Sequence, residues 1–263
     1  MSRQIVTVPG GRLEVFASEP APITLATTHP FQYFGRDGGP LFGPLSNAGR
    51  VVVVNPRGTG ASSEAIDLAA SITELVEDLD AIRRVLGLST WVVVGQSLGG
   101  CVALEYALRH PGSTAALVLS CTTAEGIADE PLSIYHPDHP DNPTIRAELA
   151  AGRSAAARQL VAHRAHLVAD EPSGGVSPDR QRSFVAQLPT LALGSRLGEL
   201  AAPTLVIGGR HDRAIPVRHA EELADGIVDA RLVIFEHSGH FPYLEEPGRF
   251  SLILREFLAP LDG

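Results

Sequence analysis

The sequence predicts an α/β protein with a mostly parallel, doubly wound sheet and a small helical insertion. Apolar runs of strand length alternate with patterns of helical period along most of the chain, and this alternation indicates βαβ units. Residues 51–54 are four consecutive valines, which is typical of a strand buried on both faces of a parallel sheet. Residues 122–202 interrupt the alternation and therefore form the predicted insertion.

Each predicted element depends on a local signal. The turn at residues 9–11, Pro-Gly-Gly, separates two strand-like runs and predicts a β-hairpin. Ser71 is an N-cap candidate with Glu74 three residues later, which predicts a helix over residues 71–86. The predicted strands are residues 4–8, 12–17, 23–27, 50–54, 91–94, 115–120, 204–207 and 231–235, and the other predicted core helices are residues 98–109, 217–224 and 249–258.

The chain is expected to consist of one core and one cap. The predicted core comprises residues 1–121 and 203–263, and the predicted cap comprises residues 122–202. The cap segment is rich in proline and alanine and has helical patterns near residues 145–169 and 178–188. Because ligands of open α/β sheets bind at the carboxyl ends of the strands, we expect the cap to lie over that edge.

The composition excludes several classes of function. The formal net charge of −9 disfavours binding to nucleic acid, because an acidic chain repels the phosphate backbone. All 21 cationic residues are arginine, which excludes a P-loop lysine, a Schiff base and a Ser-Lys dyad. The first nine residues do not form a signal peptide, and no apolar run reaches the roughly 20 residues of a membrane span. A cytoplasmic location is therefore expected.

Residues 91–100, Trp-Val-Val-Val-Gly-Gln-Ser-Leu-Gly-Gly, contain a Gly-x-Ser-x-Gly motif between a predicted strand and a predicted helix. This context is typical of a strained turn that lifts a serine hydroxyl clear of the backbone. Gly95 and Gly99 supply the small residues that the turn needs on either side of Ser97. Because a helix N-terminus favours developing negative charge, Ser97 is the predicted nucleophile.

A serine hydroxyl needs a base, and the base needs an acid that fixes its tautomer. His240 follows the last predicted strand by a few residues and is the predicted base, with His237 as the alternative. Asp212 follows the strand at residues 204–207 and is the predicted acid, although an aspartate at this place could also cap the next helix. The chain order Ser, Asp, His favours the acid role.

Four segments together resemble the α/β-hydrolase superfamily, and the resemblance covers nearly the whole chain outside the cap. Asn55 stands where the family's D-x-R-G-x-G-x-S turn has aspartate, and we interpret this turn as structural. The resemblance implies the α/β-hydrolase fold, a Ser97–Asp212–His240 triad and no cofactor. The segments are the serine motif, residues 55–62, residues 208–216 (G-G-R-x-D-x-x-x-P) and residues 239–247 (G-H-x-x-x-x-E-x-P).

The resemblance also implies an oxyanion hole made of two backbone N–H groups. The N–H of Leu98, next after the nucleophile, is the first expected donor. The second is expected after the strand at residues 23–27, where His29-Pro30-Phe31 stands. Proline has no N–H, so the predicted donor is the N–H of Phe31. The Asp-Gly-Gly-Pro turn at residues 37–40 is the alternative.

The predicted cap contains several histidines and arginines. The histidines lack acidic or cysteine partners at ligand spacing, so no metal site is expected. The arginines are interpreted as surface charges, with binding of a substrate carboxylate as the alternative. Cys101 and Cys121 lie in apolar runs and are expected to be buried free thiols. The histidines are His136, His139, His163 and His166, and the arginines include Arg146, Arg153, Arg158 and Arg164.

These features predict a serine hydrolase that cleaves a carboxylic ester or lactone of a small molecule through an acyl-enzyme intermediate. Alternatives on the same site are a C–C bond hydrolase, a proline-iminopeptidase-like enzyme and a hydrolase-like receptor with little turnover. Gln96 and Leu98 disfavour the peptidase, which usually has glycine and tryptophan there. Dehalogenases and epoxide hydrolases are disfavoured because their nucleophile is aspartate.

Overall fold

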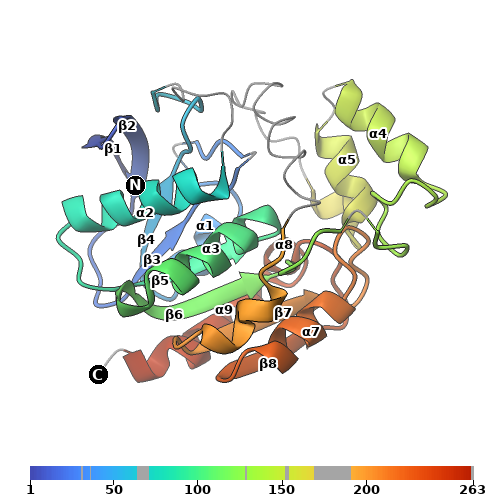
Figure 1. Cartoon of the computed structure of the whole chain (residues 1–263). Coiled ribbons are helices and arrows are strands. Elements are labelled where there is room, and N and C mark those ends of the chain that lie inside the picture. Colours follow the sequence, from blue (N-terminus) through green and yellow to red (C-terminus); the bar gives the residue numbers. More distant parts are fainter. Residues whose placement is uncertain are drawn as a thin grey trace.

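One twisted sheet forms the centre of the molecule. The computed structural model describes residues 1–30, 32–35, 37–63, 71–127, 129–151, 154–168 and 191–261. Their eight-stranded sheet has the order β1-β2-β4-β3-β5-β6-β7-β8 (Figure 1). The strands are β1 (Ser2–Val8), β2 (Gly11–Ala17), β3 (Thr24–Thr27), β4 (Arg50–Val54), β5 (Trp91–Gln96), β6 (Thr114–Ser120), β7 (Thr204–Gly209) and β8 (Ala230–Phe235).

The strand directions confirm the prediction of a mostly parallel sheet. β1 and β2 form the predicted hairpin, and β2 is also antiparallel to β4. All neighbours from β4 to β8 run parallel. The carboxyl ends of β5, β6, β7 and β8 therefore lie along one edge of the sheet, where open α/β sheets carry their sites.

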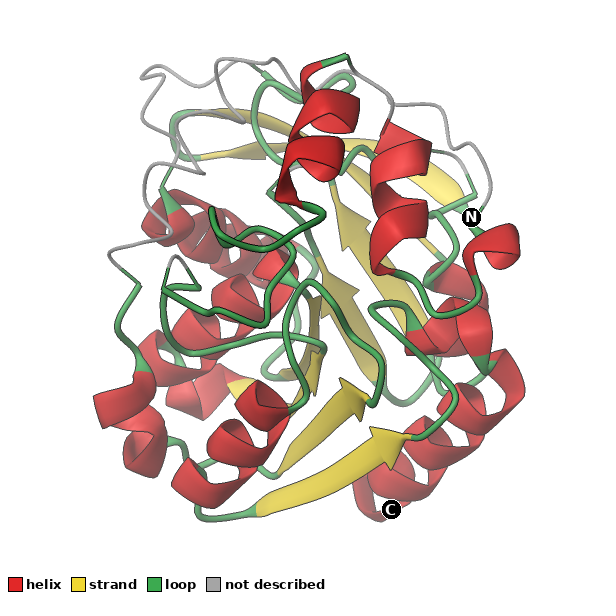
Figure 2. Cartoon of the chain, turned by 90° about the vertical axis from the view of Figure 1, so that its right-hand side faces the viewer, coloured by secondary structure: helices red, strands yellow, loops and turns green. Residues whose placement is uncertain are grey.

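Helices cover both faces of the sheet, as Figure 2 shows. Their bounds are α1 (Phe42–Ser46), α2 (Ile72–Val85), α3 (Leu98–Arg109), α4 (Asn142–Ala150), α5 (Ser154–Val161), α7 (Arg218–Gly226), α8 (Pro242–Glu245) and α9 (Pro247–Leu258). Short 3₁₀ helices are η1 (Pro111–Ser113), η2 (Ala165–Leu167), η4 (Gly194–Glu199) and η5 (Ala259–Leu261).

The four valines of β4 show how the two faces are separated. Val52 and Val54 belong to one apolar cluster, with residues of α2, α3 and α7. Val51 and Val53 belong to a second cluster, with residues of α1, α9 and the cap helices. Since successive side chains of a strand point to opposite faces, this alternation explains why residues 51–54, which are covered on both sides, are all apolar.

The core helices match their predictions closely, and the region near residues 145–169 is helical as predicted, in three separate pieces. The chain forms α4, α5 and the short η2 there. The sequence has a glycine, a weak helix former, at position 152, between α4 and α5. At the end of α5, the Val161 carbonyl accepts a hydrogen bond from the His240 N–H. The second predicted cap helix, near residues 178–188, lies outside the described residues.

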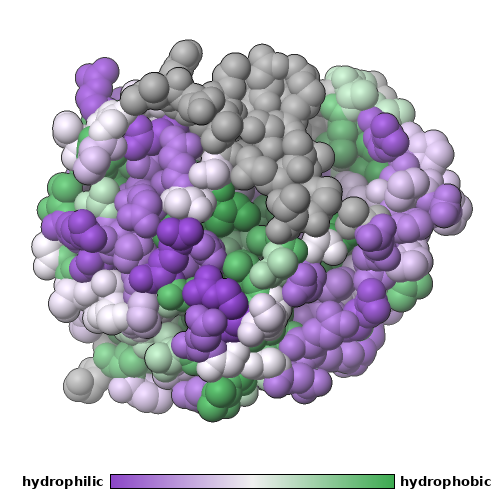
Figure 3. Space-filling model, viewed as in Figure 1, coloured by the Kyte–Doolittle hydropathy of each residue, from purple (hydrophilic) through white to green (hydrophobic). Residues whose placement is uncertain are grey.

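The helices and one face of the surface show how the chain compares with what a membrane span requires. Within the described ranges, no helix has the length and apolar character that crossing a bilayer requires. The face that carries α2 and α3 mixes hydrophilic and hydrophobic groups (Figure 3).

Candidate active site

Ser97 occupies a strained turn between β5 and α3. Its φ of 53° and ψ of −127° place a non-glycine residue at positive φ, which costs free energy and is common at functional sites. A Cβ at position 95 would overlap the Gly99 carbonyl, and a Cβ at position 99 would lie 2.6 Å from the Thr28 carbonyl oxygen. The predicted need for glycine on both sides of Ser97 therefore has a direct steric cause.

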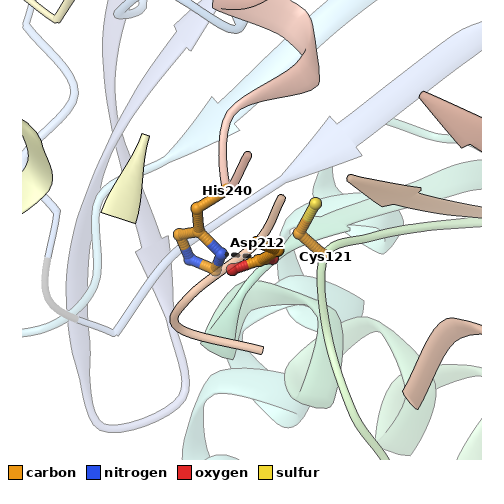
Figure 4. A group of neighbouring side chains, drawn as sticks. All are labelled: Cys121, Asp212 and His240. Carbon is orange, nitrogen blue, oxygen red and sulfur yellow. Dashed lines mark hydrogen bonds and ion pairs between the residues drawn. The ribbon is translucent and has the colours of Figure 1, made fainter. Parts of the chain in front are cut away.

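His240 and Asp212 form a buried pair at the same edge of the sheet. Nδ1 of His240 lies 2.8 Å from Oδ2 of Asp212, and both side chains are almost fully enclosed (Figure 4). Oδ1 of Asp212 accepts the N–H groups of Ala214 and Ile215 at 2.8 and 2.9 Å. Asp212 therefore does not cap α7, and its acceptor role fixes a proton on Nδ1, which leaves Nε2 as the basic nitrogen.

Glycines and one amide bring the three loops together. A Cβ on Gly209 would overlap the Gly239 carbonyl, so this glycine allows the loop after β7 to contact the loop after β8. The Gln96 amide donates to the His240 carbonyl at 3.1 Å. This hydrogen bond joins the serine turn to the loop of residues 236–241 between β8 and α8, here called the histidine loop. Within the described residues, no hydrogen bond joins the Ser97 hydroxyl directly to the His240 ring. Such contacts commonly tighten only when substrate binds.

The family model for the alpha/beta hydrolase fold matches residues 33–247, which is most of the chain. The chain belongs to the alpha/beta hydrolase fold family. It is 31% identical over 231 residues to a putative carbamate hydrolase, RutD, of Variovorax paradoxus, covering 84% of this chain and 85% of that protein. It is also 31% identical over 238 residues to 2-hydroxymuconate semialdehyde hydrolase of Pseudomonas putida, covering 83% and 80%.

A solved structure agrees with the family assignment. An alpha/beta fold family hydrolase from Bacillus anthracis superposes with a TM-score of 0.89 at 25% identity, over 98% of this chain and 99% of that one. As a member of this family the chain is a hydrolase, and its curated relatives carry hydrolase names.

In this alpha/beta hydrolase, the expected first oxyanion donor, Leu98, is the first residue of α3. The carbonyl of the same peptide unit, Ser97 O, accepts from the Thr122 hydroxyl at 2.6 Å and from the Gly100 N–H at 2.8 Å. These two hydrogen bonds fix the plane of the peptide whose N–H belongs to Leu98. Sequence reasoning missed Thr122, because the contact joins the ends of two different strands.

The second predicted oxyanion donor, Phe31, lies outside the described residues. The alternative turn at residues 37–40 uses its N–H groups internally. Gly38 donates to the Gly35 carbonyl at 2.9 Å, and Gly39 donates to the Asp37 side chain at 3.3 Å. Because these donors are occupied, this turn is a weaker candidate than the segment after β3.

The segment after β3 brings a second histidine near the candidate base. Burial, together with the electrostatic influence of the neighbouring His240 and Arg158, lowers the pKa of His29 to about 3. His29 is therefore neutral at physiological pH. Arg158, on cap helix α5, lies 5.0 Å above the ring of Phe241, the residue next to His240. This places one cap arginine close to the candidate site.

Asn55 has a tertiary role that the sequence did not reveal. Its side-chain oxygen accepts the Phe34 N–H at 2.8 Å. Its amide nitrogen donates to the Phe34 carbonyl at 3.0 Å and to the buried Glu14 carboxylate at 2.9 Å. An aspartate at position 55, as in the family pattern, would face the Glu14 carboxylate with a second carboxylate. The presence of Glu14 therefore accounts for asparagine at position 55.

The remaining predicted residues have simpler surroundings. His237 is exposed, in contrast to the buried His240. Cys101 and Cys121 are buried free thiols, as predicted. The ligand-type atoms of Cys121, Asp212 and His240 lie within 4.8 Å of one another. Burial and the Asp212 carboxylate raise the pKa of the Cys121 thiol well above its usual value, so the sulfur stays protonated and is a poor metal ligand.

The cap histidines and arginines do not form one site. His163 is exposed and its ring stacks on His211 at 4.0 Å between centroids. His166 and Arg146 are also exposed, while His136 and His139 are half-buried, and Arg153 lies outside the described residues. Arg164 contacts Glu245 through its backbone N–H and its guanidinium.

Proposed function

We propose that this hydrolase cleaves a carboxylic ester or lactone of a small molecule through an acyl intermediate on Ser97. One observation carries the proposal: the strained serine turn and the buried His240–Asp212 pair lie at the same sheet edge, joined by the Gln96 amide. His240 accepts the Ser97 proton as the oxygen attacks the carbonyl carbon, and then protonates the leaving group. Water repeats the cycle and releases the acid.

The oxyanion that forms in each half-reaction needs donors in place before the attack. The Leu98 N–H is the first donor, held by the hydrogen bonds on its own peptide carbonyl. We propose the Phe31 N–H as the second. One such donor typically contributes about 3–4 kcal/mol of transition-state stabilisation.

The walls beside Ser97 favour an uncharged acyl or alkyl group. A small cavity next to the serine is lined mainly by Leu98, Ile127, Leu191 and Ile215. Its described lining includes the acidic Glu125 and no cation, so a substrate carboxylate would be repelled there. We propose that residues 122–202 act as a cap that completes this cavity and that the protein acts in the cytoplasm on a small molecule.

A C–C bond hydrolase is the second candidate. The 31% identity to a 2-hydroxymuconate semialdehyde hydrolase favours it, and so does Arg158, which places a positive charge near His29 and His240. An activity panel separates the two candidates. It comprises p-nitrophenyl esters of increasing acyl length, aliphatic lactones, an aryl carbamate, a proline arylamide and a vinylogous diketone acid.

The test of the triad compares two histidines in one loop. Ser97→Ala and His240→Ala are expected to lower kcat for the best ester by about 10⁴-fold or more, because triad members act as a unit. His237→Ala, three residues from His240 and exposed, is expected to keep wild-type kinetics. Full activity in Ser97→Ala would refute the proposal. Absence of turnover on the whole panel, with a ligand still bound, would instead favour a receptor.

A further inference from the structure

Glu245 lies under the histidine loop with a nearly fully buried carboxylate, 2% exposed. Its Oε1 accepts the N–H of Gly239 at 2.9 Å and the N–H of Phe241 at 3.3 Å. These are the residues immediately before and after His240. A single carboxylate oxygen therefore fixes the backbone on both sides of the candidate base.

The other oxygen of the same carboxylate reaches the cap. Oε2 of Glu245 accepts the backbone N–H of Arg164 at 2.8 Å, and the Arg164 guanidinium donates to the Glu245 carbonyl at 3.0 Å. The His240 N–H donates to the carbonyl of Val161, the last residue of α5, at 3.2 Å. The histidine loop and the end of α5 thus share several hydrogen bonds.

We propose that Glu245 is a positioning residue that holds His240 in its reacting place and joins the histidine loop to the cap segment that directly follows α5. The inference depends on the proposed function for the role of His240. It goes further because it makes the placement of the base depend on the position of the cap. Hydrogen bonds from backbone N–H groups to a carboxylate are stronger than neutral ones, and only an ionised carboxylate accepts at both of its oxygens.

Glutamine at position 245 separates these two properties. Its side chain has the same size but offers an acceptor at one end and an N–H₂ group at the other. In either orientation of the glutamine, its N–H₂ group faces a backbone N–H, and two donors cannot form a hydrogen bond. Either the histidine loop or the segment after α5 therefore loses its acceptor. Glu246 is the matched control, because it is the next residue in the chain but binds the Ser238 hydroxyl, at 2.7 Å, instead of the residues on either side of His240.

The first experiment measures steady-state kinetics of Glu245→Gln and Glu246→Gln on the best ester. Glu245→Gln is expected to lower kcat by about 10- to 100-fold while KM changes by less than about threefold, because misplaced catalytic groups chiefly affect the chemical step. Glu246→Gln is expected to keep kcat within about twofold of wild type. A kcat for Glu245→Gln within about twofold of wild type would overturn the proposal.

The second experiment needs no turnover. Amide hydrogen exchange is compared between Ser97→Ala and the double variant Ser97→Ala/Glu245→Gln, followed in peptides that contain residues 239–241 and 163–165. Faster exchange in at least one of these peptides is expected, and unchanged exchange in both contradicts the proposal. Activity that survives in Ser97→Ala would refute the proposed function alone, since the exchange result still tests the contact between loop and cap.

If Glu245→Gln does not fold, Arg164→Ala tests the link between the histidine loop and the cap segment. It removes the guanidinium that donates to the Glu245 carbonyl and leaves the carboxylate in place. A loss of kcat by about three- to tenfold, with faster exchange at residues 239–241, is expected. Unchanged kcat and unchanged exchange would overturn the proposed dependence of His240 on the cap segment.

Discussion

Replacing Asn55 by aspartate tests the polar network that anchors the segment after β3. The Asn55 amide nitrogen donates to the Glu14 carboxylate at 2.9 Å and to the Phe34 carbonyl at 3.0 Å, in a fully buried place. Asn55→Asp replaces the amide nitrogen by a carboxylate oxygen, so both of these hydrogen bonds are lost. The new oxygen faces the buried Glu14 carboxylate at the distance where the amide nitrogen stood. Breaking the pairing of a buried charge typically costs about 3–5 kcal/mol, so we expect this loss of unfolding free energy at pH 8.

The effect of pH on this variant has a definite sign. Like charge raises the pKa of one carboxylate of the folded variant above its value in the unfolded chain. The variant is therefore relatively more stable at low pH, where the two groups share a proton, and loses stability as pH rises through the raised pKa. Wild-type Glu14 differs, because burial alone would raise its pKa, but hydrogen bonds from Ala61, Arg3 and Asn55 lower it.

Chemical denaturation at pH 5 and pH 8 measures the loss of unfolding free energy, and thermal unfolding at the same pH values measures the midpoint temperature. We expect a midpoint of thermal unfolding about 6–20 °C below wild type at pH 8, and a smaller difference at pH 5. Asn142→Ala is the control that removes a buried amide donor without adding a titratable group: Asn142 is buried and donates to the Ile134 carbonyl at 3.1 Å, so a loss of about 1 kcal/mol is expected at both pH values. Equal stability of Asn55→Asp and wild type at pH 8, or an equal loss at both pH values, would refute the reasoning.

Two further predictions concern polar groups beside the candidate site. Thr122→Val keeps the side-chain shape but removes the hydroxyl that donates to Ser97 O. We expect kcat to fall about 5- to 30-fold and the free energy of unfolding to fall by about 1 kcal/mol, as measured by steady-state kinetics and urea denaturation. Thr122→Ser keeps the hydroxyl and is expected to restore kcat. Burial would raise the pKa of Glu130, but hydrogen bonds from Leu132, Arg218 and His219 lower it. The stability that Glu130 contributes is therefore lost as pH falls below about 4.5, and Glu130→Gln is expected to flatten that acid limb in pH-dependent denaturation.

Much of the core could be predicted because its signals are local. The valine run of β4, the capped start of α2 and the glycines around Ser97 each depend on neighbours in the chain. Ser71 accepts the Glu74 N–H as predicted, although the Glu74 carboxylate faces Arg57. The pairing of Asp212 with His240 matches the expected geometry of the triad, while the catalytic role of the three residues stays a prediction.

The missed features depend on contacts between distant residues. Asn55 and Glu14 are 41 positions apart, and Arg164 and Glu245 are 81 positions apart. Asn55 and Glu245 each lie in one of the family-like segments, but such a segment does not name the distant partner, so the partner cannot be inferred from one sequence. The end of α5 has the same origin, because the Val161 carbonyl binds the distant His240 N–H. Tertiary hydrogen bonds, rather than helix propensity alone, set where the cap helices end.

The burial of both thiols has a practical consequence. Enclosure raises the pKa of Cys101 to about 11 and that of Cys121 above its usual value, so neither sulfur becomes a reactive thiolate at neutral pH. Oxidants and maleimides should therefore leave both thiols of the folded protein untouched, even though one sulfur neighbours the candidate acid. A probe directed at an activated serine is expected to label the native chain at position 97, and the appearance of thiol labelling would mark the moment of unfolding.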